Sequence, residues 1–168
     1  MNRLLLSALC LTALALPTLA HAQDTCAPPA DSLAAWLEEY RSVYRTLEVA
    51  TELTPRNSEQ GKGLQELSDQ VGKALAVLSE MEPLVRIAEV TTEPAVREIA
   101  WEAYYISAEF IGVVGLGPRT AEDGGSFMSA FNRTVRETNR IQERVEREHE
   151  ASWAPCADRG AFGRHRNR

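Results

Sequence analysis

The chain has 168 residues, of which 44% are hydrophobic and 25% are charged, a composition typical of a globular domain. Its 24 Asp and Glu residues outnumber its 18 Lys and Arg residues, so the net charge is −6. A chain with this balance has no overall electrostatic attraction to nucleic acid or to an anionic bilayer. Nucleic acid is therefore not expected as a partner.

Residues 1–22 have the pattern of a secretory signal peptide. Arg3 provides the positive start, Leu4–Leu16 is almost entirely apolar, and Ala20-His21-Ala22 places small residues where signal peptidase cleaves. The apolar run is shorter than the roughly 20 residues that a membrane-spanning helix needs. We therefore expect cleavage before Gln23, export to the periplasm or the extracellular space, and no transmembrane segment in the mature chain.

Two cysteines remain after this cleavage, Cys26 near the start of the mature chain and Cys156 near its end. An even number of thiols in an oxidising compartment favours pairing, so the sequence predicts one disulfide that closes most of the domain. The alternatives are two free thiols or an intermolecular bridge. A metal site is disfavoured because no Cys-x-x-Cys spacing or histidine cluster accompanies the cysteines.

The first helix is expected just after this first cysteine. Apolar residues recur at intervals of three and four from Leu33 to Ala50, which predicts an amphipathic helix of about 22 residues. Asp31 is the predicted N-cap, and Pro55 is expected to end the helix at Thr54.

A polar connection and a second helix follow. Residues 54–63 contain one proline and two glycines, which indicates a loop. Helical periodicity resumes over Leu64–Met81. Pro83 is expected to break or kink this second helix, which leaves residues 84–90 as a possible extra short helix.

A third helix is expected after Thr92, the predicted N-cap, with Pro94 in its first turn. It is apolar around most of its circumference from Val96 to Val114, which predicts a central helix contacted on several sides. The narrow polar strip of this helix consists of Glu98, Glu102, Tyr105 and Glu109.

Glycines and Pro118 end the third helix and begin the longest loop, residues 116–125. We take Arg119, Glu122 and Asp123 of this loop as candidate interaction residues, because long loops on rigid scaffolds often carry function. Ser126 is the predicted N-cap of a fourth helix that runs to about Trp153. Its predicted buried arc is Phe127, Phe131, Val135, Thr138, Ile141, Val145, His149 and Trp153.

The outer face of the fourth helix mixes the two signs of charge. Three i,i+4 ion pairs are expected there: Arg133–Glu137, Glu143–Arg147 and Arg144–Glu148.

These patterns together predict an all-α protein, an up-and-down four-helix bundle whose ends are tied by the disulfide. In that topology the first helix starts where the fourth ends, so both cysteines lie at the same pole. The bundle domain is expected to cover residues 23–157. Residues 158–168 carry four arginines and one aspartate and are expected to form a disordered basic tail.

Few residues suggest chemistry. His149 lies on the apolar arc and is the only histidine expected in a folded element; with Met81 it offers one speculative axial pair for a haem. Glu146 and His149 form a single Glu-x-x-His, whereas a di-iron bundle needs two. The sequence therefore assigns no catalytic residue, metal or cofactor.

Three functions remain open at this stage. The first is a non-catalytic exported domain that binds a protein or another envelope component. The second is a small-ligand or cofactor carrier with a pocket inside the bundle, lined by Trp36, Tyr40, Tyr104, Phe131 and Trp153. The third is a hydrolase that uses Glu98, Glu102 and Glu109, provided that one carboxylate is desolvated beside a partner.

Overall fold

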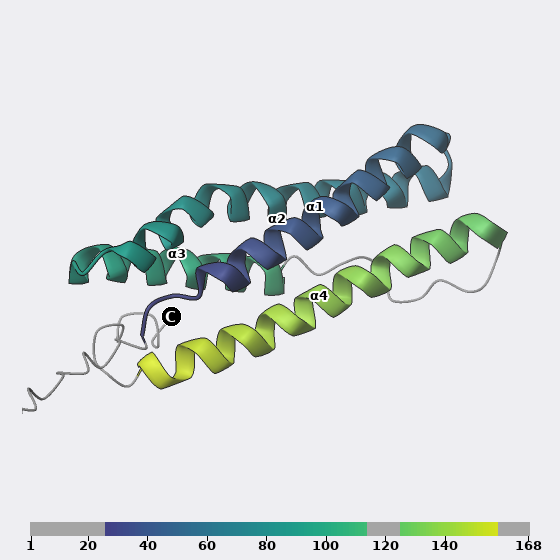
Figure 1. Cartoon of the computed structure of the whole chain (residues 1–168). Helices are drawn as coiled ribbons and strands as arrows, with labels where there is room; N and C mark the ends of the chain where they lie inside the picture. The colour runs from purple at the N-terminus through teal and green to yellow at the C-terminus, as the bar shows by residue number, and fades with distance from the viewer. Residues whose placement is uncertain (1–25, 114–124, 158–168) are drawn as a thin grey trace, which may run out of the picture.

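The computed structural model describes residues 26–113 and 125–157 (Figure 1). These residues form four helices and no strand: α1 (Ala30–Leu53), α2 (Glu59–Val90), α3 (Pro94–Val113) and α4 (Gly125–Ala157). Each of α1, α2 and α3 packs against the next, and α4 closes the ring by contacting α3 and α1 (Figure 1). The predicted all-α four-helix architecture is confirmed. The expected signal peptide, the loop residues Arg119, Glu122 and Asp123, and the basic tail lie outside the described residues.

The helices bury one face each in a shared core. α3, with 20 residues, is shorter than α4, with 33, so α3 accompanies only part of α4 along the bundle (Figure 1). Burial of a large apolar side chain stabilises the fold by roughly 1.5–3 kcal/mol. The largest fully buried side chains are Trp36, Trp101, Tyr40, Tyr104, Leu33, Leu37, Leu47, Leu64, Leu67, Leu78, Ile111 and Val71.

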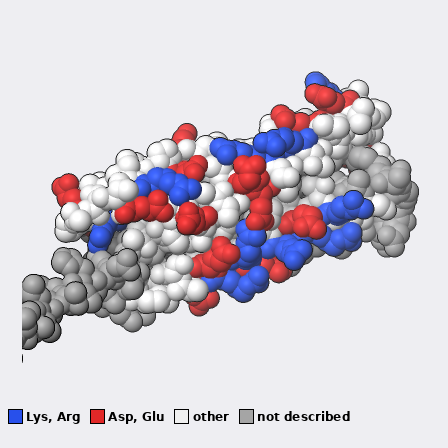
Figure 2. Space-filling model, viewed as in Figure 1, with Lys and Arg blue, Asp and Glu red and all other residues white. Residues whose placement is uncertain are grey.

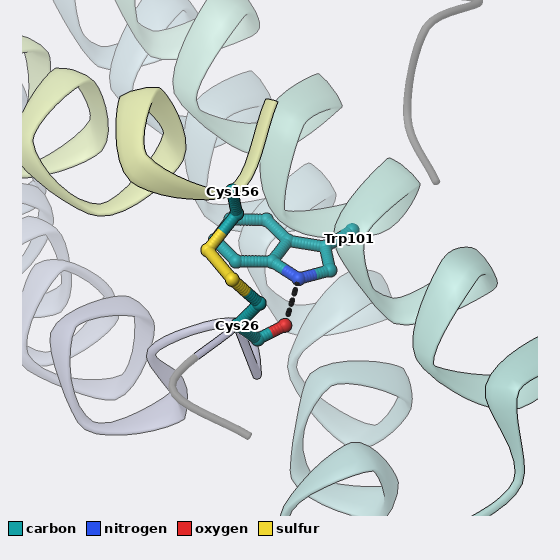
Figure 3. Close-up of a disulfide and its surroundings, with 3 residues drawn as sticks. All are labelled: Cys26, Trp101 and Cys156. Carbon is teal, nitrogen blue, oxygen red and sulfur yellow. Dashed lines mark hydrogen bonds between the residues drawn. A yellow bond between two sulfur atoms is a disulfide. The ribbon is translucent and has the colours of Figure 1, made fainter. Parts of the chain in front are cut away.

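The predicted disulfide joins the segment before α1 to the last turn of α4 (Figure 3). Cys26 and Cys156 are 130 positions apart in sequence, yet their Cα atoms lie 5.4 Å apart, within the usual range for disulfides. Beside the bridge, the indole N–H of Trp101 on α3 donates a hydrogen bond of 2.5 Å to the carbonyl oxygen of Cys26. The start of α1, the end of α4 and the interior of α3 are therefore held together at one pole.

The second helix starts five residues earlier than predicted. Ser58 is its N-cap, and the Ser58 hydroxyl accepts a hydrogen bond of 3.0 Å from the Gly61 amide. The Ser58 amide in turn donates to the carbonyl oxygen of Pro55 at 3.0 Å. The cap satisfies an amide that would otherwise be unpaired, so the second half of the expected connection becomes helix.

The second helix also runs through Pro83 without ending there. The predicted break, and the separate short helix over residues 84–90, are therefore wrong. Pro83 is exposed, while Leu78 before it and Val85 and Ala88 after it are buried on the inner face. Burial on both sides of the proline offsets the hydrogen bond that its missing N–H removes.

Two predicted N-caps, at the starts of α1 and α3, are wrong. Asp31 lies inside the first turn of α1, whose N-cap position is Pro29, and its carboxylate instead pairs with Arg86 of α2 at 3.2 Å. At the start of α3 the hydroxyl that accepts a hydrogen bond is that of Thr91, from the Glu93 amide at 3.2 Å, rather than that of Thr92.

The remaining differences concern α3 and α4. α4 begins at Gly125, so Ser126 lies within the helix instead of capping it. α3 contacts α2 and α4, but its apolar surface is not buried all round, because Ile99 and Ile106 are 53% and 40% exposed. The side chains of the arc predicted for α4 are buried or half-buried, from Phe131 to Trp153. Phe127 also belongs to the predicted arc, but its side chain is outside the described part of the structure.

Replacing both Cys26 and Cys156 with Ala should lower the free energy of unfolding by about 2–5 kcal/mol, because the unfolded chain then loses the constraint of a very long closed loop. Urea denaturation followed by circular dichroism measures this change. The helical signal before the transition should persist, since the core residues are unchanged. A loss below about 1 kcal/mol would contradict the importance given to the bridge.

Gly61→Ala should destabilise the domain by about 1–3 kcal/mol, because a methyl group there would overlap the carbonyl oxygen of Pro55. Gly63→Ala is the matched control, since a methyl group at Gly63 meets only the ring of Phe131 at ordinary contact distance. Within a helix that substitution should stabilise by about 0.5–1 kcal/mol. Thermal midpoints of the two variants should therefore move in opposite directions, and equal shifts would contradict this account.

Candidate functional site

The most distinctive surface of the molecule is a row of arginines on α4. Successive members are three, four, four and three residues apart, so at 100° per residue they share about 80° of the helix circumference and extend over about 21 Å. Basic side chains gather along α4 on the face shown in Figure 2. We call this row the arginine face; it consists of Arg133, Arg136, Arg140, Arg144 and Arg147.

One arginine of the row, Arg144, is clamped between two helices. The Arg144 guanidinium pairs with the carboxylate of Glu39 on α1 and, at 3.3 Å, with Glu148 one turn along α4. The other oxygen of Glu148 accepts a hydrogen bond of 2.7 Å from the indole N–H of Trp36 on α1. Charge-assisted hydrogen bonds of this type are stronger than neutral ones, so the network fixes α4 against α1 at this level.

The other four arginines of the arginine face are exposed. Within the described ranges, no carboxylate oxygen lies within 4 Å of their guanidinium nitrogens. Of the three predicted i,i+4 pairs, only Arg144–Glu148 forms, while Arg133–Glu137 and Glu143–Arg147 do not. Exposed pairs gain little in water against the side-chain entropy that they lose, which accounts for their absence.

A groove with a volume of about 330 Å³ adjoins the arginine face between α1 and α4. Its apolar lining residue, Ile141, is almost fully buried. The other lining residues are charged: Glu39, Glu137, Arg140, Arg144 and Arg147. The groove therefore offers guanidinium donors together with two carboxylate acceptors.

A larger hollow of about 470 Å³ lies at the start of α2, remote in sequence from the arginine face. Its lining includes basic, acidic and amide side chains, and all of its lining residues come from one continuous segment, residues 56–73. Its lining has three basic and two acidic side chains, as the groove has, but its basic residues are one arginine and two lysines, and only the groove adjoins the arginine face.

His149 lies in an aromatic cluster near the disulfide pole. Its ring centroid is 5.5 Å from that of Tyr104, 5.3 Å from that of Tyr105 and 6.3 Å from that of Trp153. Its Nδ1 atom is buried without a hydrogen-bond partner in the described structure. Burial lowers the pKa of His149, and the negative charge of Glu109 opposes this effect in part. The imidazole therefore favours the neutral form in the folded state.

The aromatic residues proposed to line an internal pocket belong to the packed core or lie against it. Trp36 lies 5.2 Å from Tyr104, and Trp101 lies 5.6 Å from Tyr104 and 5.3 Å from Trp153, measured between ring centroids. Neither the groove nor the hollow is lined by them. They act as core, which weakens the interpretation of the protein as a ligand carrier.

The structure does not place His149 and Met81 in one site. His149 takes its ring neighbours from α3 and α4, whereas Met81 is half-buried on α2, the helix diagonal to α4. Glu146, the partner of His149 in the Glu-x-x-His pattern, is exposed and accepts a hydrogen bond of 3.2 Å from Gln142. No three His, Cys, Asp or Glu side chains of the described ranges are grouped to hold a metal ion.

The carboxylates proposed for hydrolysis are on the outside of the bundle. Glu98, Glu102 and Glu109 are all exposed on α3 and line neither the groove nor the hollow. General acid–base catalysis is favoured by a carboxyl group that is desolvated beside a partner, whereas these three side chains face water. This arrangement gives the hydrolase hypothesis no support.

Sequence reasoning missed the arginine face because it considered each arginine with its nearest glutamate. The informative signal is the spacing of the arginines themselves, from Arg133 to Arg147, which keeps them on one side of the helix. The acids of α4 fall elsewhere on the circumference. An angular count of each charge type separately would have found the surface.

A comparison of the chain with protein-family models, curated proteins and solved structures finds no match. None of the helices in the described ranges has the length and apolar character needed to cross a bilayer. A functional hypothesis must therefore come from the chemistry of the residues themselves.

Replacing His149 with Phe should flatten the pH dependence of stability below about pH 6.5, the ordinary pKa of histidine. Because the pKa is lowered in the folded state, the unfolded chain binds the proton first. The wild-type domain is therefore most favoured above that pH and loses stability as the pH falls through the interval between the unfolded and folded pKa values.

Urea unfolding between pH 7.5 and pH 5 measures this effect, with His165→Gln as the control at another histidine of the chain. The control should behave like the wild type. If His149→Phe retained the full wild-type slope, the assignment of the slope to His149 would be wrong.

Proposed function

We propose that the protein is an exported, non-catalytic helical domain that binds a protein of the cell envelope or its surroundings through the arginine face. One observation carries this proposal: four exposed guanidinium groups are aligned on one side of α4, and no carboxylate of the described residues pairs with them. Arginine is enriched in protein interfaces because its planar fork makes directed hydrogen bonds to carboxylates.

The scaffold behind this surface is suited to binding. α4 is fixed at its end by the disulfide and near its middle by the network of Arg144, Glu39 and Glu148. A surface held in place before binding loses less conformational entropy when a partner docks. The arginines therefore present a row of positive charge in a fixed geometry.

Export is the setting that this proposal requires. The leader-like residues 1–22 and the long-range disulfide are consistent with an oxidising compartment. Disulfides form and persist in secreted and periplasmic proteins and are rare in cytosolic ones.

Affinity capture from envelope extract under non-reducing conditions tests the proposed function. The test variant carries Arg133→Gln, Arg136→Gln, Arg140→Gln and Arg147→Gln, and we expect it to retain less than about one tenth of the partner captured by the wild type. Quantitative mass spectrometry of the retained proteins measures the difference.

The control variant removes the same number of exposed positive charges from α1 and α2, through Arg41→Gln, Arg45→Gln, Lys62→Gln and Lys73→Gln. It should capture as the wild type does. Equal capture by both variants and the wild type would reject the arginine face as the binding surface.

A further inference from the structure

We infer that the arginine face takes an acidic α-helix of a partner protein, laid along α4 with its carboxylates on a single stripe. This inference rests on the proposed binding function and names the class of partner. Its starting point is the register of the arginine face, which repeats with the turn of an α-helix over about 21 Å.

A second helix matches that register. Two helices that pack at a small crossing angle, about 20°, stay side by side over several turns. Glutamates spaced by three and four residues on the partner would then meet arginines with the same spacing. Each guanidinium can bind a carboxylate through two parallel hydrogen bonds, which an exposed and unpaired arginine such as Arg136 or Arg140 has free to offer.

Acidic side chains border the arginine face on both sides and select against broad anionic surfaces. On the helical wheel Glu137 lies about 20° beyond one edge of the row and Glu143 about 20° beyond the other. A flat bilayer or a bulky polyanion that reached the arginines would also meet these carboxylates. A helix contacts a narrower strip than either of these surfaces, so it meets fewer of the flanking carboxylates.

The groove adds a requirement for the partner. Glu39 and Glu137 line it beside Arg140 and Arg147, and Ile141 is its apolar lining residue. A partner helix that carries only acids would place negative charge against both glutamates. The best match therefore has acids along the stripe and a hydroxyl or basic side chain on the flank that faces the groove.

The clamped arginine of the row makes the fit specific to one orientation of α4. Arg144 is held by Glu39 and Glu148, and Glu148 is held in turn by the indole of Trp36. The four exposed arginines are arranged on either side of this clamp. Because they are in water, their attraction is screened over about 10 Å at 0.1 M salt, so binding should weaken as salt is raised.

The experiment uses two synthetic Ala/Gln-based helical peptides of identical composition. In the first, five glutamates are spaced by three, four, four and three residues, which places them on one stripe. In the second, the five glutamates are spaced by five residues, which distributes them around the helix. Isothermal titration against the mature, disulfide-bonded protein at low salt measures both affinities.

We expect the stripe peptide to bind one per protein and about tenfold more tightly than its isomer. The variant with glutamine at positions 133, 136, 140 and 147 should lose at least tenfold in affinity, whereas the variant altered at Arg41, Arg45, Lys62 and Lys73 should stay within about twofold. A variant with lysine at the same four α4 positions keeps the charge and should retain most of the binding, which separates loss of charge from loss of fold.

Equal binding of the two peptides would overturn the inference, as would tighter binding of phosphatidylglycerol vesicles or of inorganic polyphosphate than of the stripe peptide. Its failure is distinguishable from failure of the proposed function. If envelope capture depends on the arginine face but the peptides bind equally, the helical partner is wrong and the binding role stands. If the variant without the four exposed arginines captures as much partner as the wild type, the assignment of the arginine face as the binding surface is wrong.

Discussion

The bond between Cys26 and Cys156, with the indole of Trp101 beside it, is the constraint on which the arrangement of the bundle depends. The bridge joins Cys26, which precedes α1, to Cys156 in the last turn of α4. The hydrogen bond from Trp101 to the Cys26 carbonyl adds α3 to the same junction. A buried carbonyl without that donor would lose its interaction with water and gain nothing in return. The covalent and hydrogen bonds therefore act as one anchor for three helices.

This anchor matters most for α4, because α4 has an apolar side and a charged side that lie opposite each other. Its inner arc, which includes Val135, Ile141 and Val145, faces the core, and its opposite side carries the arginine face. The rotation of α4 about its own axis decides where the arginines point. That rotation is set by the buried arc, by the disulfide, and by the clamp of Arg144 between Glu39 and Glu148. The geometry of the surface is thus a consequence of how the core is packed.

The helices, the buried arc of α4 and the cysteine pair were predictable because each depends on local periodicity or on chain topology. The start of α2 and the passage of that helix through Pro83 were not, since they depend on the Ser58 cap and on burial of Val85 and Ala88 against other helices. Exposure of Ile99 was hidden for a related reason: an apolar residue on an apolar helix gives no local sign of which side meets solvent. Tertiary contacts decided these points, as they decided which arginines of α4 would find a carboxylate.

The arginine face also links binding to stability. Like charges three and four residues apart on a helix repel by a few tenths of a kcal/mol per pair, and Arg133, Arg136, Arg140 and Arg147 lack the neighbouring carboxylate contacts that would offset this repulsion. In the unfolded chain the same residues are farther apart and repel less. A ligand that places negative charge along the row therefore removes a cost that exists only in the folded state, and by mass action it stabilises that state in proportion to its occupancy. Under the proposed function, binding of an acidic partner and the integrity of α4 are one coupled equilibrium.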